Sequence, residues 1–206
     1  MSCRAQTFSC TDAHFFRDVA KARLAIAAAL ILFVPFFSIT AGQQAQDLGG
    51  SPTDPLKETP GKVVVLVFVR TDCPVSNRYA PLLQEMSVKY GREATVWLVF
   101  PDKNESPESI RSYLQEFNYK LPALRDTEHF LVRKSGAKVT PEVAVFNLKR
   151  DLVYHGRIDD LYREFGKARR MATTHELADA IEAASKGVAP RSAAAEGVGC
   201  FISDLK

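Results

Sequence analysis

The stretch VVVLVFV-RTDCPVSN, residues 63–77, decides the fold. Its run of β-preferring apolar residues predicts a strand that is covered on both faces, as in a sheet of parallel strands with helices on either side. Cys73 follows this strand at the point where a helix is expected to begin. In such sheets, ligands bind beyond the carboxyl ends of the strands. Cys73 therefore stands where an active-site residue is expected.

The same position favours a reactive thiol at Cys73. The first N–H groups of a helix have no partner within the helix, and the positive end of its dipole favours a thiolate over a thiol. Asp72 acts in the opposite direction, because a neighbouring negative charge disfavours the thiolate. A small buried cysteine without a chemical role is the alternative, since free cysteines are among the most buried residues.

The helix expected after Cys73 contains a proline. Its apolar residues recur with helical spacing, and Ala80-Pro81 interrupts the pattern. Proline inside a helix removes a hydrogen bond and bends the axis. Together with Thr140-Pro141 later in the chain, the pattern resembles the thioredoxin superfamily. In that superfamily a nucleophilic cysteine opens a helix, an Ala-Pro kink follows, and a cis-proline faces the cysteine.

The chain is most similar to the redoxin, or AhpC/TSA-like, branch of that superfamily. The resemblance is carried by LPALRD (121–126), VTPEVAVF (139–146) and LVYHGR (152–157). It implies an α/β, thioredoxin-like fold with a mixed central β-sheet flanked by helices, in the order β-α-β-α-α-β-β-α. The folded domain is accordingly expected over residues 61–186.

Four positions depart from the mechanisms of the superfamily. Thioredoxins carry a second cysteine where this chain has Ser76, and a buried acid where it has Val67. Peroxiredoxins carry threonine and proline where it has Arg70 and Leu66. Disulfide exchange and peroxide reduction both remain open as activities of a thiol oxidoreductase, and the missing peroxiredoxin residues favour disulfide exchange.

The resemblance also implies a substrate site around the cysteine. A cis-proline at Pro141 would leave the backbone of Thr140 free to pair with an extended thiol substrate, which is strand addition on a short edge. Pro74 and Ser76, at the start of the helix, are expected beside this substrate. A trans proline in an ordinary turn is the alternative at Pro141.

Arg157 follows the last expected strand and should border Cys73 in this fold. Its guanidinium could lower the pKa of the thiol or bind an anionic or peroxidic oxygen. Asp159 and Asp160 could instead hold Arg157 in a structural ion pair. Both roles stay open at this point.

Local patterns predict the remaining elements. We expect a buried strand over 94–100, a helix opened by Ser106-Pro107, a short helix over 128–135 ending at Gly136, a hairpin of 143–146 and 152–155, and a last helix opened by a capping box at 173–176.

The amino-terminal part predicts export. Residues 24–41 are uncharged and apolar and follow several basic residues, so residues 1–42 are expected to be a signal peptide or a membrane anchor. Residues 43–60 are polar and contain glycine and proline, which indicates a linker. We therefore expect an extracytoplasmic protein, periplasmic or secreted, that contacts the membrane if residues 24–41 are retained. A net charge of +3 gives no indication of nucleic-acid binding.

Only Cys73 and Cys200 then reach the oxidising side, because Cys3 and Cys10 precede the apolar segment. Cys200 lies in a tail over residues 187–206, and its apolar surroundings, GVGCFI, are expected to dock on the domain at the end of a flexible polar connection. Its first expected role is to resolve the mixed disulfide or sulfenic acid formed on Cys73. The alternatives are a permanent Cys73–Cys200 disulfide in a non-catalytic binding module, an intermolecular bridge, and no bond at all.

No metal or cofactor is expected. Copper chaperones of the superfamily use two cysteines four residues apart, and the second position here is Asn77. The two cysteines could gather a soft metal only with His129, His155 or His175. The expected partners are therefore a protein thiol or disulfide, or a hydroperoxide, together with a thiol reductant.

Overall fold

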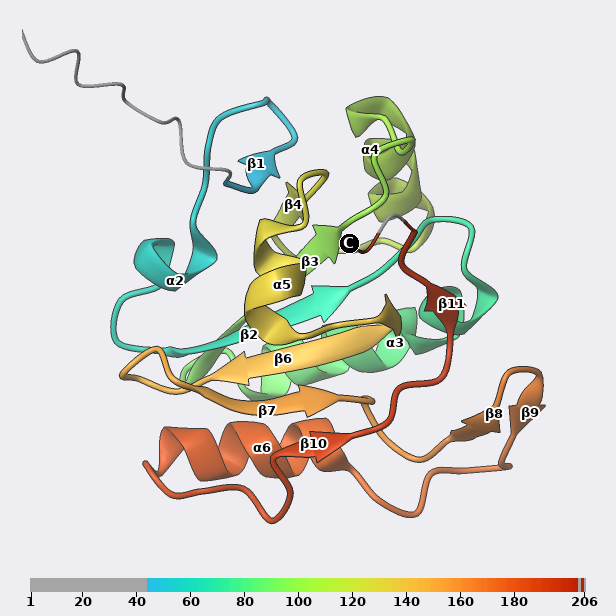
Figure 1. Ribbon diagram of the computed structural model, residues 1–206. Coiled ribbons are helices and arrows are strands. Elements are labelled where there is room, and N and C mark those ends of the chain that lie inside the picture. The colour runs from blue at the N-terminus through green and yellow to red at the C-terminus, as the bar shows by residue number, and fades with distance from the viewer. Residues whose placement is uncertain (1–43, 204, 206) are drawn as a thin grey trace, which may run out of the picture. The chain divides into compact units, whose positions relative to one another are not determined.

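The computed structural model describes residues 44–203 and 205, and their centre is a mixed seven-stranded sheet. The strand order is β1-β4-β3-β2-β6-β7-β10 (Figure 1). These strands are β1 (Gln46–Asp47), β2 (Val63–Phe68), β3 (Ala94–Phe100), β4 (Ala123–Arg125), β6 (Glu142–Phe146), β7 (Leu152–Gly156) and β10 (Ala194–Ala195). β2 runs parallel to β3 and antiparallel to β6. The predicted mixed sheet is confirmed, and so is the antiparallel hairpin of β6 and β7.

Helices cover both faces of the sheet. They are α2 (Pro55–Glu58), α3 (Pro74–Lys89), α4 (Pro107–Glu116), α5 (Phe130–Ser135) and α6 (Glu176–Ser185). Side chains of α3, α4 and α6 belong to one hydrophobic cluster, and those of α2 and α5 belong to a second. Figure 1 shows α5 and α6 on opposite sides of the sheet.

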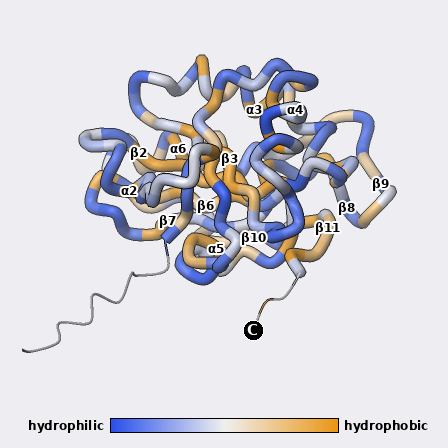
Figure 2. The backbone as a smooth tube through the Cα atoms, turned by 90° about the horizontal axis from the view of Figure 1, so that it is seen from above, coloured by the Kyte–Doolittle hydropathy of each residue, from blue (hydrophilic) through white to orange (hydrophobic). Residues whose placement is uncertain are grey.

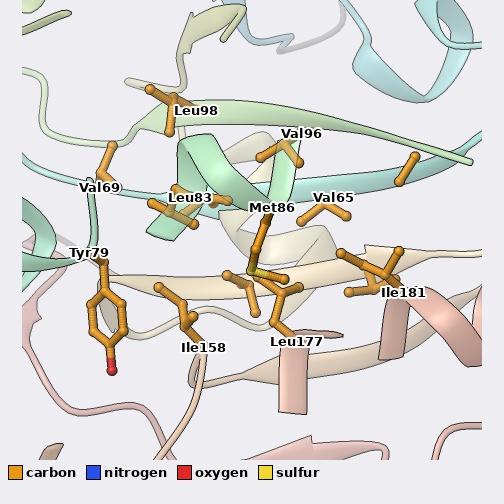
Figure 3. Packing of buried hydrophobic residues seen from close by; sticks show 14 of the residues in the cluster. Val65, Val69, Tyr79, Leu83, Met86, Val96, Leu98, Ile158, Leu177 and Ile181 are labelled. Carbon is orange, nitrogen blue, oxygen red and sulfur yellow. The ribbon is translucent and has the colours of Figure 1, made fainter. Parts of the chain in front are cut away.

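β2 joins the two clusters because its side chains alternate between the faces. The odd-numbered residues of 63–69 belong to the first cluster, and the even-numbered residues belong to the second. All of them are fully buried, as the unbroken apolar run predicts. Figure 3 shows the first cluster, where Val65 of β2, Met86 of α3 and Leu177 of α6 gather. Figure 2 shows hydrophobic residues along the central strands β2 and β3.

Two helix ends confirm their predicted signals. Ser106 caps α4 by accepting the N–H of Ser109, and Pro107 occupies the first turn. α5 ends at Gly136, whose φ of 75° is the left-handed conformation that favours glycine.

The capping box expected at 173–176 is wrong. Thr173 donates its N–H and its hydroxyl to Asp160, and α6 begins only at Glu176, after His175, whose side chain makes no cap. An ionised carboxylate is the stronger acceptor, and Asp160 comes within reach because the chain folds back between β7 and α6.

Residues 44–60, expected to be a linker, are part of the domain. β1 pairs antiparallel with β4 at the edge of the sheet, and Ala45 and Leu56 are buried in the second cluster. Asp54 caps α2 by accepting the N–H of Leu56. The segment was expected to be a linker because most of its residues are polar, but a few apolar side chains attach it to the domain.

Further strands lie outside the predicted elements. β4 extends the sheet in parallel beside β3. Between β7 and α6 the chain forms a hairpin of β8 (Tyr162–Glu164) and β9 (Lys167–Ala168). This hairpin projects from the domain in both views (Figure 1, Figure 2).

The carboxyl-terminal tail pairs with the domain twice, where a flexible connection was expected. β10 runs parallel to β7, and β11 (Cys200–Phe201) pairs antiparallel with β5 (Val139–Thr140). Gly156 ends β7 with a φ of 134°, and a Cβ atom there would stand 1.8 Å from the Ala195 carbonyl oxygen. The backbone of β10 therefore packs directly on this glycine, which directs the tail toward β5.

Among residues 44–203, no helix has the length and apolar character needed to cross a membrane. The predicted signal or anchor at residues 24–41 lies outside the described residues, as do Cys3 and Cys10.

We expect Gly156→Ala to release β10 from the sheet. The added methyl group collides with the backbone of Ala195, in a conformation that side chains rarely adopt. Urea denaturation should show a loss of about 2–4 kcal/mol in the free energy of unfolding. Gly61→Ala is the control, because Gly61 has a φ of 73° and open space around it, and we expect a loss of about 1 kcal/mol there. Equal losses would contradict the close packing of β10 on Gly156.

Candidate active site

Cys73 lies at the start of α3, where the sequence predicts it. It is fully buried, it is the N-cap residue of the helix, and its Sγ donates to the Thr140 carbonyl oxygen at 3.1 Å. The Thr140-Pro141 peptide bond is cis, as the resemblance implies. The cysteine and the proline loop, which are far apart in the sequence, therefore face each other.

Cys200 completes a pair of thiols. Its Sγ donates to Cys73 Sγ at 2.9 Å, and both cysteines are free. This contact follows from strand pairing, since Cys200 stands opposite Thr140 in the ladder of β5 and β11. The Thr140 hydroxyl also donates to the Cys200 carbonyl oxygen at 3.4 Å. The fold thus brings together two cysteines that lie 127 positions apart.

The two thiols differ in acidity. Burial alone would raise the pKa of Cys73, but the Cys200 thiol and the N–H and hydroxyl of Ser76 favour the thiolate and outweigh burial, so the pKa lies below its usual value. Burial raises the pKa of Cys200, and its hydrogen bond to Cys73 raises it further. At neutral pH the thiolate fraction of Cys73 is therefore the larger of the two.

Ser76, which stands where thioredoxins have their second cysteine, lies inside the site. Its hydroxyl is buried and makes no hydrogen bond among the described residues. It is therefore available to donate to a Cys73 thiolate, which is the charged form that such a bond favours. Pro74, in the first turn of α3, is exposed next to the buried cysteine.

Arg157 is held in an ion pair. Its guanidinium binds the carboxylate of Glu176 at the start of α6, and this partner raises the pKa of Arg157. The acids considered from the sequence have other partners: Asp159 accepts the hydroxyl of Tyr79 at 2.5 Å, and Asp160 holds the loop before α6. The geometry therefore supports a structural role for Arg157 and corrects the identity of its acidic partner.

Two charged residues near the site were not predicted. Arg70 lies between β2 and Cys73 and pairs with Asp72 at 2.9 Å. Glu105, in the loop after β3, accepts the N–H of Thr71 at 2.6 Å, and burial raises its pKa. Because the carboxyl ends of the parallel strands β2 and β3 meet at one edge, the loop after β3 could have been included among the candidates.

The histidines considered as metal ligands do not form a metal centre with the cysteines. Among the described residues, no group of three His, Cys, Asp or Glu side chains is arranged to hold a metal ion. His129 is instead buried, with its Nε2 3.1 Å from the Pro101 carbonyl oxygen.

Comparisons with known proteins agree with the fold. A family model described as thioredoxin-like matches residues 61–152. A hypothetical protein from Sinorhizobium meliloti 1021 is similar over 77% of this chain and 88% of its own, with 24% identity and a TM-score of 0.66. An uncharacterized conserved protein from Geobacillus kaustophilus is similar over 77% of this chain and 86% of its own, with 18% identity and a TM-score of 0.67. At these identities the likeness shows the fold.

A shorter match is to a secreted disulfide oxidoreductase of Mycobacterium tuberculosis. It covers 52% of this chain and 78% of that protein, with 20% identity and a TM-score of 0.46. No curated protein matches the sequence.

We expect Ser76→Ala to slow the alkylation of Cys73 by iodoacetamide about tenfold at pH 7. The change removes a donor to the thiolate, so the pKa of Cys73 rises and the thiolate fraction falls at neutral pH. The curve of rate against pH should move to higher pH with the same plateau. Ser87→Ala on the same helix is the control, because the Ser87 hydroxyl binds the carbonyl oxygen of Gln84. A curve that coincides with that of the native protein would contradict this role for Ser76.

We expect Arg157→Gln to affect stability but not the thiol. The ion pair with Glu176 is partly exposed, so its loss should lower the free energy of unfolding by about 1 kcal/mol or less. Glu176→Gln should have a similar effect, and the alkylation rate of Cys73 should stay unchanged in both variants. Slower alkylation of Cys73 in Arg157→Gln alone would contradict this prediction and would show that Arg157 activates the thiol.

Proposed function

We propose that the chain is a thiol oxidoreductase with Cys73 as the nucleophile and Cys200 as the resolving thiol, in line with the thioredoxin-like family model that matches residues 61–152. The observation that carries this proposal is the 2.9 Å contact between the two sulfur atoms. A resolving thiol must reach the sulfur that it attacks, and Cys200 is already there. The lowered pKa of Cys73 and the raised pKa of Cys200 support the same division of roles.

The reaction consists of two thiol–disulfide exchanges. The Cys73 thiolate attacks one sulfur of a substrate disulfide, so a Cys73–substrate disulfide forms and the other substrate sulfur leaves as a thiolate. Cys200 loses its proton to a leaving thiolate, attacks Cys73, and expels the second substrate thiolate as the Cys73–Cys200 disulfide forms. Two electrons pass from the protein to the substrate, and a thiol reductant returns them by the reverse exchanges.

The interaction between the two thiols determines the step at which Cys200 ionises most readily. After burial, the largest causes of the raised pKa of Cys200 are its hydrogen bond to the Cys73 sulfur and the charge of that sulfur. When Cys73 enters a mixed disulfide, its negative charge is lost and this contribution disappears. Cys200 then ionises more readily, at the step in which its thiolate is needed.

A protein disulfide fits the geometry better than a hydroperoxide. Cys73 donates to the backbone of Thr140, and the edge of β5 already pairs with a peptide strand. A hydroperoxide is the second candidate substrate. It would be reduced to an alcohol as Cys73 becomes a sulfenic acid, and Cys200 would then form the same disulfide with release of water.

The reaction is proposed to take place outside the cytoplasm. The support is the apolar segment at residues 24–41 with basic residues ahead of it. Exported proteins meet the oxidising conditions in which a cysteine pair cycles through a disulfide. If the segment is retained, it tethers the domain to the membrane.

A turnover assay separates the enzyme from a non-catalytic binding module. The full chain carrying Cys3→Ser and Cys10→Ser is tested for reduction of insulin disulfides by dithiothreitol and, separately, for consumption of hydrogen peroxide. Cys73→Ser should abolish turnover. Cys200→Ser should keep the first exchange and accumulate a covalent adduct of Cys73 with the substrate, seen as added mass without reductant.

Ser192→Ala is the matched control, because Ser192 lies exposed in the same tail. Its turnover should equal that of the native chain. Turnover that survives Cys73→Ser, or a native chain that reduces neither substrate, would contradict the proposal and leave the binding module with a permanent disulfide.

A further inference from the structure

The tail occupies the edge on which a substrate would have to bind. β11 pairs antiparallel with β5, and Cys200 stands opposite Thr140 beside the fully buried Cys73. A strand edge pairs with one partner at a time. A peptide can therefore reach Cys73 along β5 only after β11 has left. The contacts that β11 makes with β5 indicate which peptide residues this edge can bind.

The residue before the cysteine fits only as glycine. A Cβ atom on Gly199 would stand 1.9 Å from the Thr140 carbonyl oxygen and 2.6 Å from the Thr140 carbonyl carbon. Both atoms belong to the backbone, so no side-chain movement relieves the contact. Any strand that takes the register of β11 brings its residue before the cysteine to this same point.

The residue two positions after the cysteine fills an apolar site. Ile202 is only 5% exposed and belongs to the cluster of α2 and α5, while its N–H donates to the Lys138 carbonyl oxygen at 3.0 Å. Phe201, between the two, is 80% exposed. The edge thus contacts the residues on either side of Phe201 and leaves Phe201 itself in solvent.

We infer that residues 199–202 are a built-in mimic of the substrate, and that the β5 edge selects extended cysteine peptides of the form Gly-Cys-any-aliphatic. This inference rests on the proposed function and names the substrate class of its disulfide exchange. In the cycle, the substrate strand displaces β11 as Cys73 forms the mixed disulfide. The return of β11 then removes the substrate strand from β5 and brings Cys200 back to attack Cys73.

The test uses octapeptides with the sequence of residues 196–203, EGVGCFIS, whose cysteine carries a thionitrobenzoate group in a disulfide. Cys73 attacks the peptide sulfur and forms a mixed disulfide with it, and coloured thionitrobenzoate leaves as the thiolate. The initial rate with the reduced full chain, carrying Cys3→Ser and Cys10→Ser, gives the second-order rate constant of the first exchange for each peptide. The same mixed disulfide of cysteamine measures reactivity without recognition.

Alanine in place of the glycine before the cysteine should lower this rate constant about tenfold or more, and so should aspartate in place of the isoleucine. Serine in place of the phenylalanine should leave it unchanged, because that position is exposed. Equal rates for all four peptides, with the cysteamine disulfide also turned over, would overturn the inference while the proposed function stands. If no peptide and no cysteamine disulfide reacts, the proposed function itself fails.

A substitution in the tail tests whether β11 covers Cys73. Gly199→Ala should dislodge β11, so that Cys73 is alkylated about tenfold faster or more on the high-pH plateau, where the thiolate fraction no longer limits the rate. Gly49→Ala is the matched control, because a Cβ there meets only the side chain of Asp47, at 3.2 Å. An unchanged rate in Gly199→Ala would show that β11 does not guard Cys73 and would overturn the inference.

Discussion

The antiparallel pairing of β11 with β5 is the interaction on which the site depends. Without it Cys73 would be a single thiol at a helix start, because Ser76 stands where a nearby second cysteine would be. The ladder itself is short, with Cys200 opposite Thr140 and Phe201 opposite Val139. Its position is set at both ends, by the packing of β10 on Gly156 and by the burial of the residue after β11. The position of β11 beside Cys73 is therefore fixed, although only a few hydrogen bonds must break when β11 separates from β5.

Burial and charge oppose each other at Cys73, and the donors around it decide the outcome. A thiolate in the interior is penalised by desolvation. The helix start, the Ser76 hydroxyl and the Cys200 thiol supply the compensating interactions, and they lower the pKa of Cys73 in spite of its burial. One of these donors arrives with the tail. In the proposed cycle, the acidity of the nucleophile is therefore linked to the position of β11.

The sequence predicts the centre of the fold and the nucleophile, because both are encoded locally. The apolar run before Cys73 marks a doubly covered strand, and the cis bond at Pro141 follows from the family resemblance. The short strands β1, β4 and β10 have no local signature, since they form where an open sheet edge accepts the backbone of two or three residues. The partner of Arg157 and the place of Glu105 were missed for a similar reason, because loops distant in sequence bring these groups together. The docking of Cys200 was predicted from the apolar residues around it, but its register opposite Thr140 was not.

The redox state of the two cysteines shows whether Cys73 and Cys200 act as a pair. The full chain with Cys3→Ser and Cys10→Ser is equilibrated in glutathione buffers of increasing oxidising strength, free thiols are trapped by alkylation, and the peptides are identified by mass without reduction. We expect a Cys73–Cys200 crosslink that forms in oxidising buffers and opens in reducing ones, in a single two-electron transition. Two alkylated thiols in every buffer, or a crosslink that no glutathione buffer opens, would contradict this prediction.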